Sequence, residues 1–252
     1  MTFKKRFNPK ISIITVTKNS EKFIERNILS IINQSYKNYE HIIIDGNSSD
    51  KTIEIVNKYK NNISKIVSEN DDGLYEAMNK GISNTTGDII GILNSDDYFY
   101  ENALKIVMKN FQANRNIDFL FGSVNKYTHR YGYYPWRISW TFNFYPAHSV
   151  GFFIKKEAQL KVGLYNTKYK YSADYDLFYR MIVGMKMKGI ATEKNDILGH
   201  FSSGGLSSRI KYIDYLNENT LIRLDNGQNK FVVKIIHFLR YIKRIKLILK
   251  EK

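Results

Sequence analysis

The first half of the chain alternates short apolar runs with segments whose apolar residues recur every three or four positions. Runs of β-branched residues predict buried strands, and the periodic segments predict amphipathic helices. Strands are expected at 11–16, 41–45, 63–68 and 88–93, and helices at 20–34, 51–59 and 73–82. Strands that alternate with helices pair in parallel, so the sequence predicts an α/β fold with ligands bound beyond the carboxyl ends of the strands.

After residue 112 the pattern is less regular. Residues 117–124 favour another strand, and residues 174–185 favour a helix. The segment 131–146 is rich in aromatic residues and contains both tryptophans. Aromatic faces can stack on sugar rings, but such a segment can equally belong to the core or to a membrane interface.

Polar and acidic residues follow the strands at the edge where ligands are expected. The carboxylates after the second, third and fourth strands are Asp45 and Asp50, Asp71 and Asp72, and Asp96 and Asp97. Adjacent carboxylates such as the last pair repel each other unless a cation compensates, and oxygen ligands suit Mg²⁺ and Mn²⁺. Any one of them could instead cap a helix, and for Asp50 capping is favoured. Together they predict a cleft that holds a cation and a polar ligand.

The net charge of +15 is concentrated at the two ends of the chain. Residues 1–10 hold four basic residues and no acid, and residues 226–252 hold eight basic residues and one acid. Nucleic-acid binders more often carry their charge across a folded face, so no nucleic-acid partner is expected. A basic amphipathic helix at 230–252 is expected to lie on an anionic membrane surface, or else to pack on the body with a solvated basic face.

Composition also indicates a compartment. The chain has no cysteine, which excludes disulfides and thiolate metal sites. Its first residues lack the apolar core of a secretory signal, and no run reaches the roughly 18 apolar residues of a spanning helix. We therefore expect a cytoplasmic protein, peripheral on the inner face of a bacterial plasma membrane.

Four motifs occur in a recognisable order: "ISIITVTKN" from 11, "IIIDGNSSDKT" from 42, "DDGLYEAMNKGI" from 71 and "GDIIGILNSDD" from 87. In order and spacing they resemble the family 2 glycosyltransferases of the GT-A fold, most closely the bacterial enzymes that build O-antigen and exopolysaccharide. The resemblance is strong over 11–100 and weaker to about 208. It implies a GT-A domain over 1–225, with a nucleotide-sugar half at 11–112 and an acceptor half at 113–225, followed by a basic amphipathic helical tail at 226–252.

The resemblance implies a role for several donor-side residues. Thr15 and Thr17 would line the nucleotide pocket, and Asp45 would hydrogen-bond the nucleobase, usually uracil. Asp96 would face the ribose or the adjacent sugar, and Asp97 would bind the Mn²⁺ or Mg²⁺ that bridges the donor diphosphate. Asn94 stands where the first carboxylate of the family's D-x-D motif often lies, which makes metal dependence a question to test. Lys80 would contact the donor, or would be an ordinary solvated helix lysine.

The acceptor-side residues follow from "YSADYDLFYRM" at 171–181 and "HFSSGGLSS" at 200–208. By resemblance Asp174 is the catalytic base, which a helix N-terminus would keep ionised, although a plain N-cap is the alternative. Asp174 is favoured over Asp176, which lies two residues further into the helix. His148 would contact acceptor or donor sugar, or be a structural histidine. In the second motif, Gly204 and Gly205 would let a loop close over the diphosphate, and His200 would be an additional metal ligand.

The predicted activity is transfer of a hexosyl or N-acetylhexosaminyl unit, with inversion, from a nucleotide-sugar to a saccharide. The donor is expected to be UDP-linked, and the acceptor to be lipid-linked, in surface polysaccharide biosynthesis. One alternative is a sugar nucleotidyltransferase, but the stretch "TVTKNSEKF" at 15–23 has no glycine for its phosphate loop. The other is a non-catalytic nucleotide- or polyanion-binding module, against which the nearly balanced charge of residues 11–225 argues.

Overall fold

A seven-stranded sheet forms the centre of the protein, in a computed structural model that describes residues 8–140, 144–202 and 210–251. The strand order is β10-β6-β9-β4-β1-β2-β3, and β9 alone runs antiparallel to its two neighbours. The predicted mainly parallel α/β sheet is therefore confirmed. Its strands are β1 (Ile11–Thr17), β2 (Tyr39–Asp45), β3 (Lys65–Ser68), β4 (Ile89–Ile92), β6 (Phe119–Phe121), β9 (Phe152–Lys155) and β10 (Gly189–Ala191).

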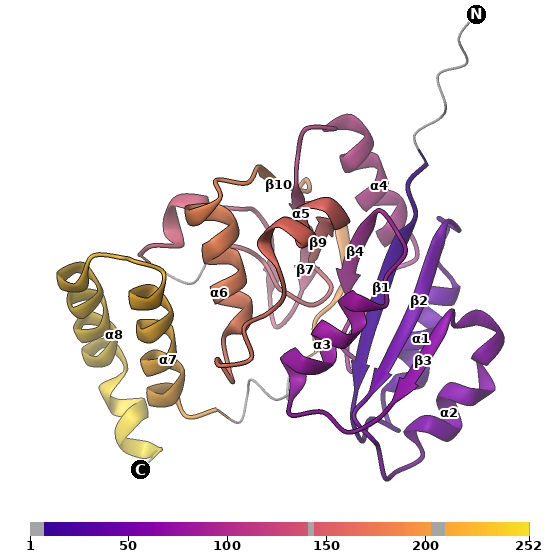
Figure 1. The fold of residues 1–252 in the computed structure, drawn as a ribbon, viewed down its shortest axis with the longest axis horizontal. Coiled ribbons are helices and arrows are strands. Elements are labelled where there is room, and N and C mark those ends of the chain that lie inside the picture. Colours follow the sequence, from indigo (N-terminus) through magenta and orange to yellow (C-terminus); the bar gives the residue numbers. More distant parts are fainter. Residues whose placement is uncertain (1–7, 141–143, 203–209, 252) are drawn as a thin grey trace, which may run out of the picture.

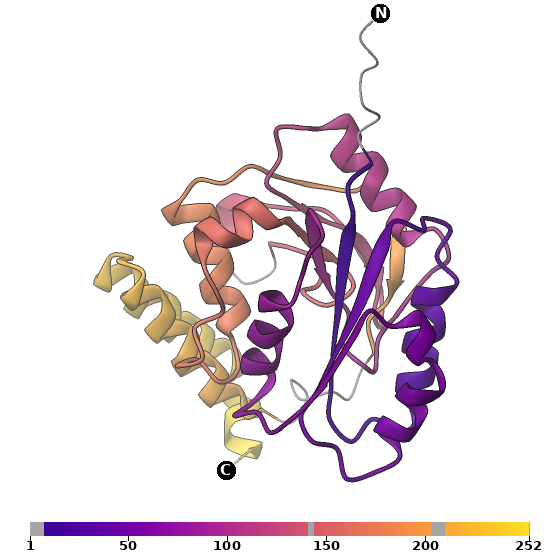
Figure 2. The same cartoon turned by 45° about the vertical axis from the view of Figure 1, so that its right-hand side comes forward.

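Helices cover both faces of this sheet (Figures 1 and 2). Side chains alternate across each strand, so Ile14 and Val16 of β1 pack toward α3 and α6, whereas Ile11 and Ile13 pack in the cluster that contains α4. The helices of the first half are α1 (Ile24–Ile32), α2 (Thr52–Lys58), α3 (Leu74–Ser83) and α4 (Ala103–Ala113), with a 3₁₀ turn at Lys60–Asn62. Because both faces of the sheet are covered, its strands read as continuous apolar runs.

A second, four-stranded sheet packs beside the first, in the order β5-β11-β7-β8. The strand expected at 117–124 is divided between the two sheets, with β6 in the large one and β7 in the small one. Gly122 lies where the chain passes from the large sheet to the small one. A Cβ atom there would come 2.0 Å from Leu198 Cδ1, so this position needs a residue without a side chain. The strands of this sheet are β5 (Tyr98–Phe99), β7 (Ser123–Asn125), β8 (His129–Arg130) and β11 (Ile197–His200).

The rest of the second half is helical. The predicted helix at 174–185 is α-helical only to Tyr179 and continues as a π-helical turn. A helical hairpin of α7 and α8 packs beside α6, and Asn229 caps α8 by accepting from the N–H groups of Phe231 and Val232. These elements are α5 (Lys156–Val162), α6 (Ala173–Tyr179), the π turn Arg180–Gly184, α7 (Tyr212–Asp225) and α8 (Lys230–Lys250), with a 3₁₀ turn at Pro135–Arg137.

Among the described helices, none combines the length and the apolar character that crossing a bilayer requires. The longest, α8, buries only Val233, Ile236 and Ile248. The division into a domain at 1–225 and a tail at 226–252 stays a prediction.

Candidate active site

The loops that follow the parallel strands meet at one edge of the sheet. The N–H of Gly46, after β2, donates to the carbonyl of Thr17 at the end of β1 (2.9 Å). The hydroxyls of Ser20 and Ser95, after β1 and β4, lie 2.8 Å apart. In the sheet register Asp45 pairs with both Thr17 and Ser68, so the ends of β1, β2 and β3 are level. The convergence that the sequence predicts is present.

Asp45 orders the loop that follows its own strand. Its carboxylate is fully buried and accepts hydrogen bonds from the Ser48 N–H (3.0 Å), the Ser48 hydroxyl and the Ser68 hydroxyl (2.7 Å). Three donors therefore hold this carboxylate in place at the edge of the sheet. Next to it, a Cβ atom on Gly46 would come 2.3 Å from Asp71 Oδ2, so the loops after β2 and β3 lie in close contact.

The two threonines of β1 have different surroundings. Thr15 is fully buried, and its hydroxyl lies 3.1 Å from Asn27 Oδ1 of α1 and 3.0 Å from His41 Nε2 of β2. It is thus engaged inside the protein. Thr17 ends the strand, and its buried Oγ1 has no hydrogen-bond partner among the described residues. Thr17 is therefore the threonine with hydrogen-bonding capacity left for a ligand.

The adjacent carboxylates after β4 are the most strongly perturbed acids of the site. Asp97 is 1% exposed, and Ser202 donates its N–H to Asp97 Oδ1 (2.7 Å). Burial, followed by the charge of Asp96, raises the pKa of Asp97 to about 7. The Ser149 hydroxyl, which accepts from the Asn94 N–H (2.9 Å), lies near Asp97 and lowers that pKa. By hydrogen-bond geometry, Asp97 Oδ2 has no partner within the described part of the chain. Burial also raises the pKa of Asp96.

Asp97 and Asn94 fit a divalent cation that takes most of its ligands from phosphates and water. Asp97 Oδ2 and Asn94 Oδ1 are both buried oxygens without partners in the described chain. A dication there would offset the repulsion between the two carboxylates. No group of three His, Cys, Asp or Glu side chains among the described residues could hold a metal alone. Mg²⁺-type sites commonly use one or two carboxylates and complete the shell with phosphates and water.

His200 does not join the carboxylates in the described geometry. Its ring stacks on Tyr98, its partner across β5 and β11, with centroids 5.3 Å apart. Arg26 covers the same tyrosine at 4.4 Å and donates to the carbonyl of Asp96 (2.8 Å). The predicted loop residues Gly204 and Gly205 lie outside the described residues.

Lys126 is a cationic residue of the site that sequence reasoning missed. Burial, and next the charge of Arg130, lowers the pKa of Lys126, while Asp97 and Asp96 raise it. Its ammonium therefore lies within electrostatic range of both carboxylates, where it could interact with a diphosphate. It follows the short strand β7, in the half of the chain with no regular pattern to mark it.

Asp174 occupies the first turn of α6, where two tyrosine hydroxyls hold its carboxylate. Tyr75 donates to Oδ1 (3.1 Å) and Tyr145 donates to Oδ2 (3.0 Å), and the Tyr175 N–H also donates to Oδ1 (2.9 Å). Because Tyr75 lies in the first turn of α3, directly after the loop that follows β3, Asp174 faces the same edge of the sheet as the donor-side loops. Neither tyrosine was predicted.

Asp176, the less favoured candidate, is occupied. It is 3% exposed, forms an ion pair with Arg180 (2.9 Å) and accepts from Asn226 Nδ2 (2.9 Å). A carboxylate with such partners stabilises the helix and is not free to take a proton. The preference for Asp174 over Asp176 agrees with this arrangement.

His148 and Lys80 have partners inside the protein. His148 Nε2 lies 2.7 Å from the Tyr165 hydroxyl, and burial lowers the pKa of the histidine although Asp174 raises it. Lys80 forms ion pairs with Glu69 (2.9 Å) and Glu76 (3.4 Å), which fixes the loop after β3. In this structure the Lys80 ammonium is thus engaged in ion pairs that hold the loop after β3.

Comparison with known sequences gives the family to which this α/β chain belongs. The model of glycosyl transferase family 2 matches residues 12–170. The chain belongs to this family.

Individual relatives match over different lengths. An uncharacterised glycosyltransferase of Haemophilus influenzae is 38% identical over 100 residues, which are 38% of this chain and 40% of that protein. The chondroitin synthase of Pasteurella multocida is 28% identical over 233 residues, which are 88% of this chain and 23% of that protein. The chain thus spans well under half the length of these relatives.

Solved structures confirm the fold. S. aureus TarS 1–349 superposes with a TM-score of 0.69 at 18% identity, covering 93% of this chain and 72% of that one. The mannosyltransferase PcManGT of Pyrobaculum calidifontis, solved with GDP-Man and Mn²⁺, gives a TM-score of 0.67 at 16% identity, covering 94% and 70%. The expected GT-A architecture, with additional C-terminal helices, is therefore confirmed.

Proposed function

We propose that the protein transfers a hexosyl or N-acetylhexosaminyl unit, with inversion, from a UDP-linked sugar to a hydroxyl group of a saccharide. The observation that supports this most directly is Asp174, a partly exposed carboxylate held by two tyrosine hydroxyls at the edge of the sheet that carries the Asp96–Asp97 pair. The donor class is supported by TarS, which was solved with UDP-GlcNAc, and by the chondroitin and hyaluronan synthases among the relatives.

The proposed step is one displacement at the anomeric carbon. The acceptor oxygen attacks the anomeric carbon from the face opposite the diphosphate, and this direction of attack inverts the configuration. Asp174 takes the proton of the attacking hydroxyl. The bond from the anomeric carbon to the diphosphate oxygen breaks, and its electron pair leaves with the UDP. Tyr75 and Tyr145 orient the base, because each donates its hydroxyl to one of the two Asp174 oxygens.

On the donor side, Asp45 and Thr17 are proposed to order and contact the nucleotide, and Asp96 the ribose or sugar. Lys126 places positive charge beside the departing diphosphate. Asp97, with Asn94, would hold Mn²⁺ or Mg²⁺. When bound, such an ion would supply Lewis-acid stabilisation of the charge on that diphosphate.

The test is a panel of UDP- and GDP-sugars, assayed for nucleotide release with and without Mn²⁺, followed by Asp174→Asn on the donor that reacts. General-base catalysis contributes typically 10²- to 10⁴-fold, so the variant should lose about that factor in kcat while its affinity for UDP is unchanged. Asp214→Asn, which removes an exposed carboxylate from α7, is the matched control and should keep full activity. Full transfer by Asp174→Asn would show that another group is the base.

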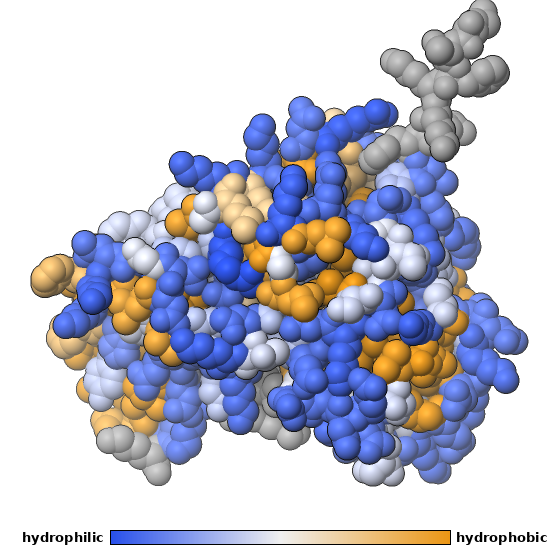
Figure 3. Space-filling view, in the orientation of Figure 1, coloured by the Kyte–Doolittle hydropathy of each residue, from blue (hydrophilic) through white to orange (hydrophobic). Residues whose placement is uncertain are grey.

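We also propose that α8 holds the protein on an anionic membrane surface, where it would reach a lipid-linked acceptor of the O-antigen or exopolysaccharide type. Six apolar side chains at helical spacing are at least half exposed along this helix, and apolar side chains gather over the C-terminal helices in Figure 3. They are Phe231, Ile235, Phe238, Leu239, Ile242 and Leu249. Basic residues alternate with them, and each near an anionic surface adds about 1 kcal/mol.

Vesicle sedimentation tests this attachment. Binding should be strong to vesicles that contain phosphatidylglycerol, weak to pure phosphatidylcholine, and lost in Phe238→Ser/Leu239→Ser with the fold intact. Equal binding to both vesicles, or a concentration-dependent dimer that the double variant abolishes, would assign this helix face to another role.

A further inference from the structure

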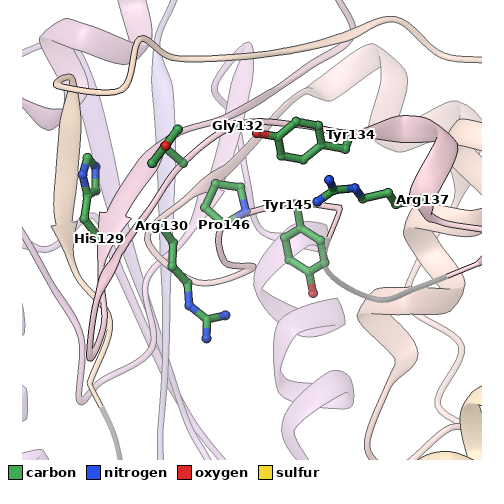
Figure 4. A pocket seen from close by; sticks show the side chains of 8 residues that line it. His129, Arg130, Gly132, Tyr134, Arg137, Tyr145 and Pro146 are labelled. Atoms are coloured by element: carbon green, nitrogen blue, oxygen red, sulfur yellow. The ribbon is translucent and has the colours of Figure 1, made fainter. Parts of the chain in front are cut away.

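A pocket of about 240 Å³ adjoins the proposed base. Tyr145 lines this pocket, and its hydroxyl donates to Asp174 Oδ2 (3.0 Å), so one side chain contacts both the pocket and the proposed base. Its lining residues are His129, Arg130, Tyr131, Gly132, Tyr134, Arg137, Tyr145 and Pro146. In Figure 4, Arg130 and Arg137 extend from opposite sides, with Pro146 and Tyr145 between them.

The pocket is positively charged. Two arginines and a histidine line it, and none of its lining residues is acidic. The Arg130 side chain is exposed and forms no hydrogen bond or ion pair with another described residue, although its backbone pairs with Val124 of β7. Lys194 adds a further cation nearby, because its Nζ lies 4.8 Å above the ring of Tyr131.

Aromatic rings accompany the cations. Arg137 lies over Tyr134 (4.2 Å) and close to Trp136 (5.0 Å), which holds its guanidinium in place. Tyr131 and Trp136 are exposed, at 44% and 65%. Flat rings suit sugar faces, while a preorganised guanidinium binds a carboxylate or phosphate through two parallel hydrogen bonds.

We infer that the acceptor is an anionic saccharide, whose carboxylate or phosphate group is bound by Arg130 and Arg137 in this pocket while its reacting hydroxyl lies at Asp174. The inference rests on the proposed function, since it takes Asp174 to be the base. The volume is below the roughly 300–1,000 Å³ of pockets for drug-sized ligands, so the pocket fits one sugar unit rather than a longer chain.

The donor diphosphate is the competing anion for these arginines. On the donor side, Thr17, Asn94 and Asp97 each have a buried oxygen without a partner among the described residues, at the ends of β1 and β4. The pocket is lined by Tyr145, which donates to Asp174, but its Arg130 is also within electrostatic range of Lys126, the lysine proposed to lie beside the diphosphate. A measurement that reads donor and acceptor binding separately decides between the two.

Three matched probes provide that measurement: methyl glucoside, methyl glucuronide and methyl glucoside 6-phosphate, titrated by ligand-observed NMR against the full chain. At least one anionic probe should bind about tenfold or more tightly than the neutral one, which is the scale of a single charge-assisted contact. The glucuronide and phosphate arms distinguish the two sources of charge. Arg130→Gln should abolish the preference, and Lys105→Gln, which removes an exposed cation from α4, should leave it unchanged.

UDP affinity, measured by calorimetry on the same variants, keeps the inference separate from the proposed function. Arg130→Gln and Arg137→Gln should leave UDP affinity unchanged. A loss of UDP binding in these variants would assign the pocket to the donor and overturn the inference, as would equal binding, or no binding, of all three probes. A lack of nucleotide release from every sugar donor would instead contradict the proposed function, whatever the probes do.

Discussion

The substitution Asp97→Asn gives the sharpest test of the site, because the buried Asp97 carboxylate destabilises the folded protein and is also the proposed ligand of the cation. Burial, followed by the charge of Asp96, raises the pKa of Asp97 from 3.8 to about 7. An acid whose pKa is raised by folding keeps its proton in the folded state while the unfolded chain ionises. For this group, the free energy of unfolding therefore falls as the pH rises from about 4 to about 7, and it is constant above that range.

The size of the effect follows from the shift. About three pKa units at 1.36 kcal/mol each set an upper limit of about 4 kcal/mol. Side-chain movement and water entry lower the cost of a buried ion in real proteins, so we expect about 2 kcal/mol. In a chain of this length that corresponds to about 4 to 8 °C in Tm. Metal-free Asp97→Asn should exceed the wild type by this amount at pH 8 and match it at pH 4.

The assay is differential scanning calorimetry in EDTA from pH 4 to pH 8, repeated with Mn²⁺ and UDP. The additions should raise the Tm of the wild type at pH 8 by more than that of Asp97→Asn, which keeps only the UDP contacts of Asp45 and Thr17, and should support transfer only by the wild type. Asp214→Asn, which removes an exposed carboxylate from α7, serves as the control and should follow the wild type throughout. A Tm difference that is the same at pH 4 and pH 8 would refute the burial argument. Equal stabilisation of both proteins by Mn²⁺ would refute Asp97 as the ligand.

Three further changes have defined outcomes. Burial raises the pKa of Glu40, but the hydrogen bonds that this carboxylate accepts lower it to about 2. In urea unfolding at pH 7, Glu40→Gln should therefore be less stable than the wild type by about 2 kcal/mol. This difference should disappear as the pH falls below about 4 toward 2. Tyr145→Phe removes one of the hydrogen bonds to Asp174 and should lower kcat about tenfold with the donor KM unchanged, as initial rates would show. Gly91→Ala places a methyl group 2.4 Å from the Phe153 ring in the core and should cost about 2 kcal/mol in thermal unfolding; an unchanged Tm would mean that the ring moves freely.

The sequence predicts the first half of this fold well because local patterns determine it. Strands β1 to β4 alternate with helices, and β1, β2 and β4 are buried, largely apolar runs, whereas β3 at the edge is partly exposed. In the second half, β9 runs antiparallel between β4 and β6, so its position depends on partners about 35 and 60 residues away. No local pattern carries that information, and the division at Gly122 likewise depends on Leu198.

The same distinction applies to the site. Asp97 and Asp174 are visible in the sequence because each belongs to a short motif at the end or start of an element. Tyr75 reads as part of the apolar face of a helix, and it is indeed 8% exposed. Its hydroxyl nevertheless reaches Asp174, 99 residues away, and only the folded chain shows that contact.

One strained residue lies next to the segment that supports the proposed cation site. Val150 is a β-branched residue with a φ of 69°, a conformation that costs of order 1–3 kcal/mol. Its N–H donates to the carbonyl of Ile92 (3.0 Å), and this backbone places the neighbouring Ser149 hydroxyl on the Asn94 N–H (2.9 Å). The segment that carries the strain therefore supports the end of β4, where Asn94 and Asp97 each leave a buried oxygen without a partner in the described chain. A protein optimised for stability alone would relax Val150 and satisfy those oxygens. Because the surrounding core holds them instead, these oxygens stay available at the edge of the sheet where a cation and a diphosphate are proposed to bind.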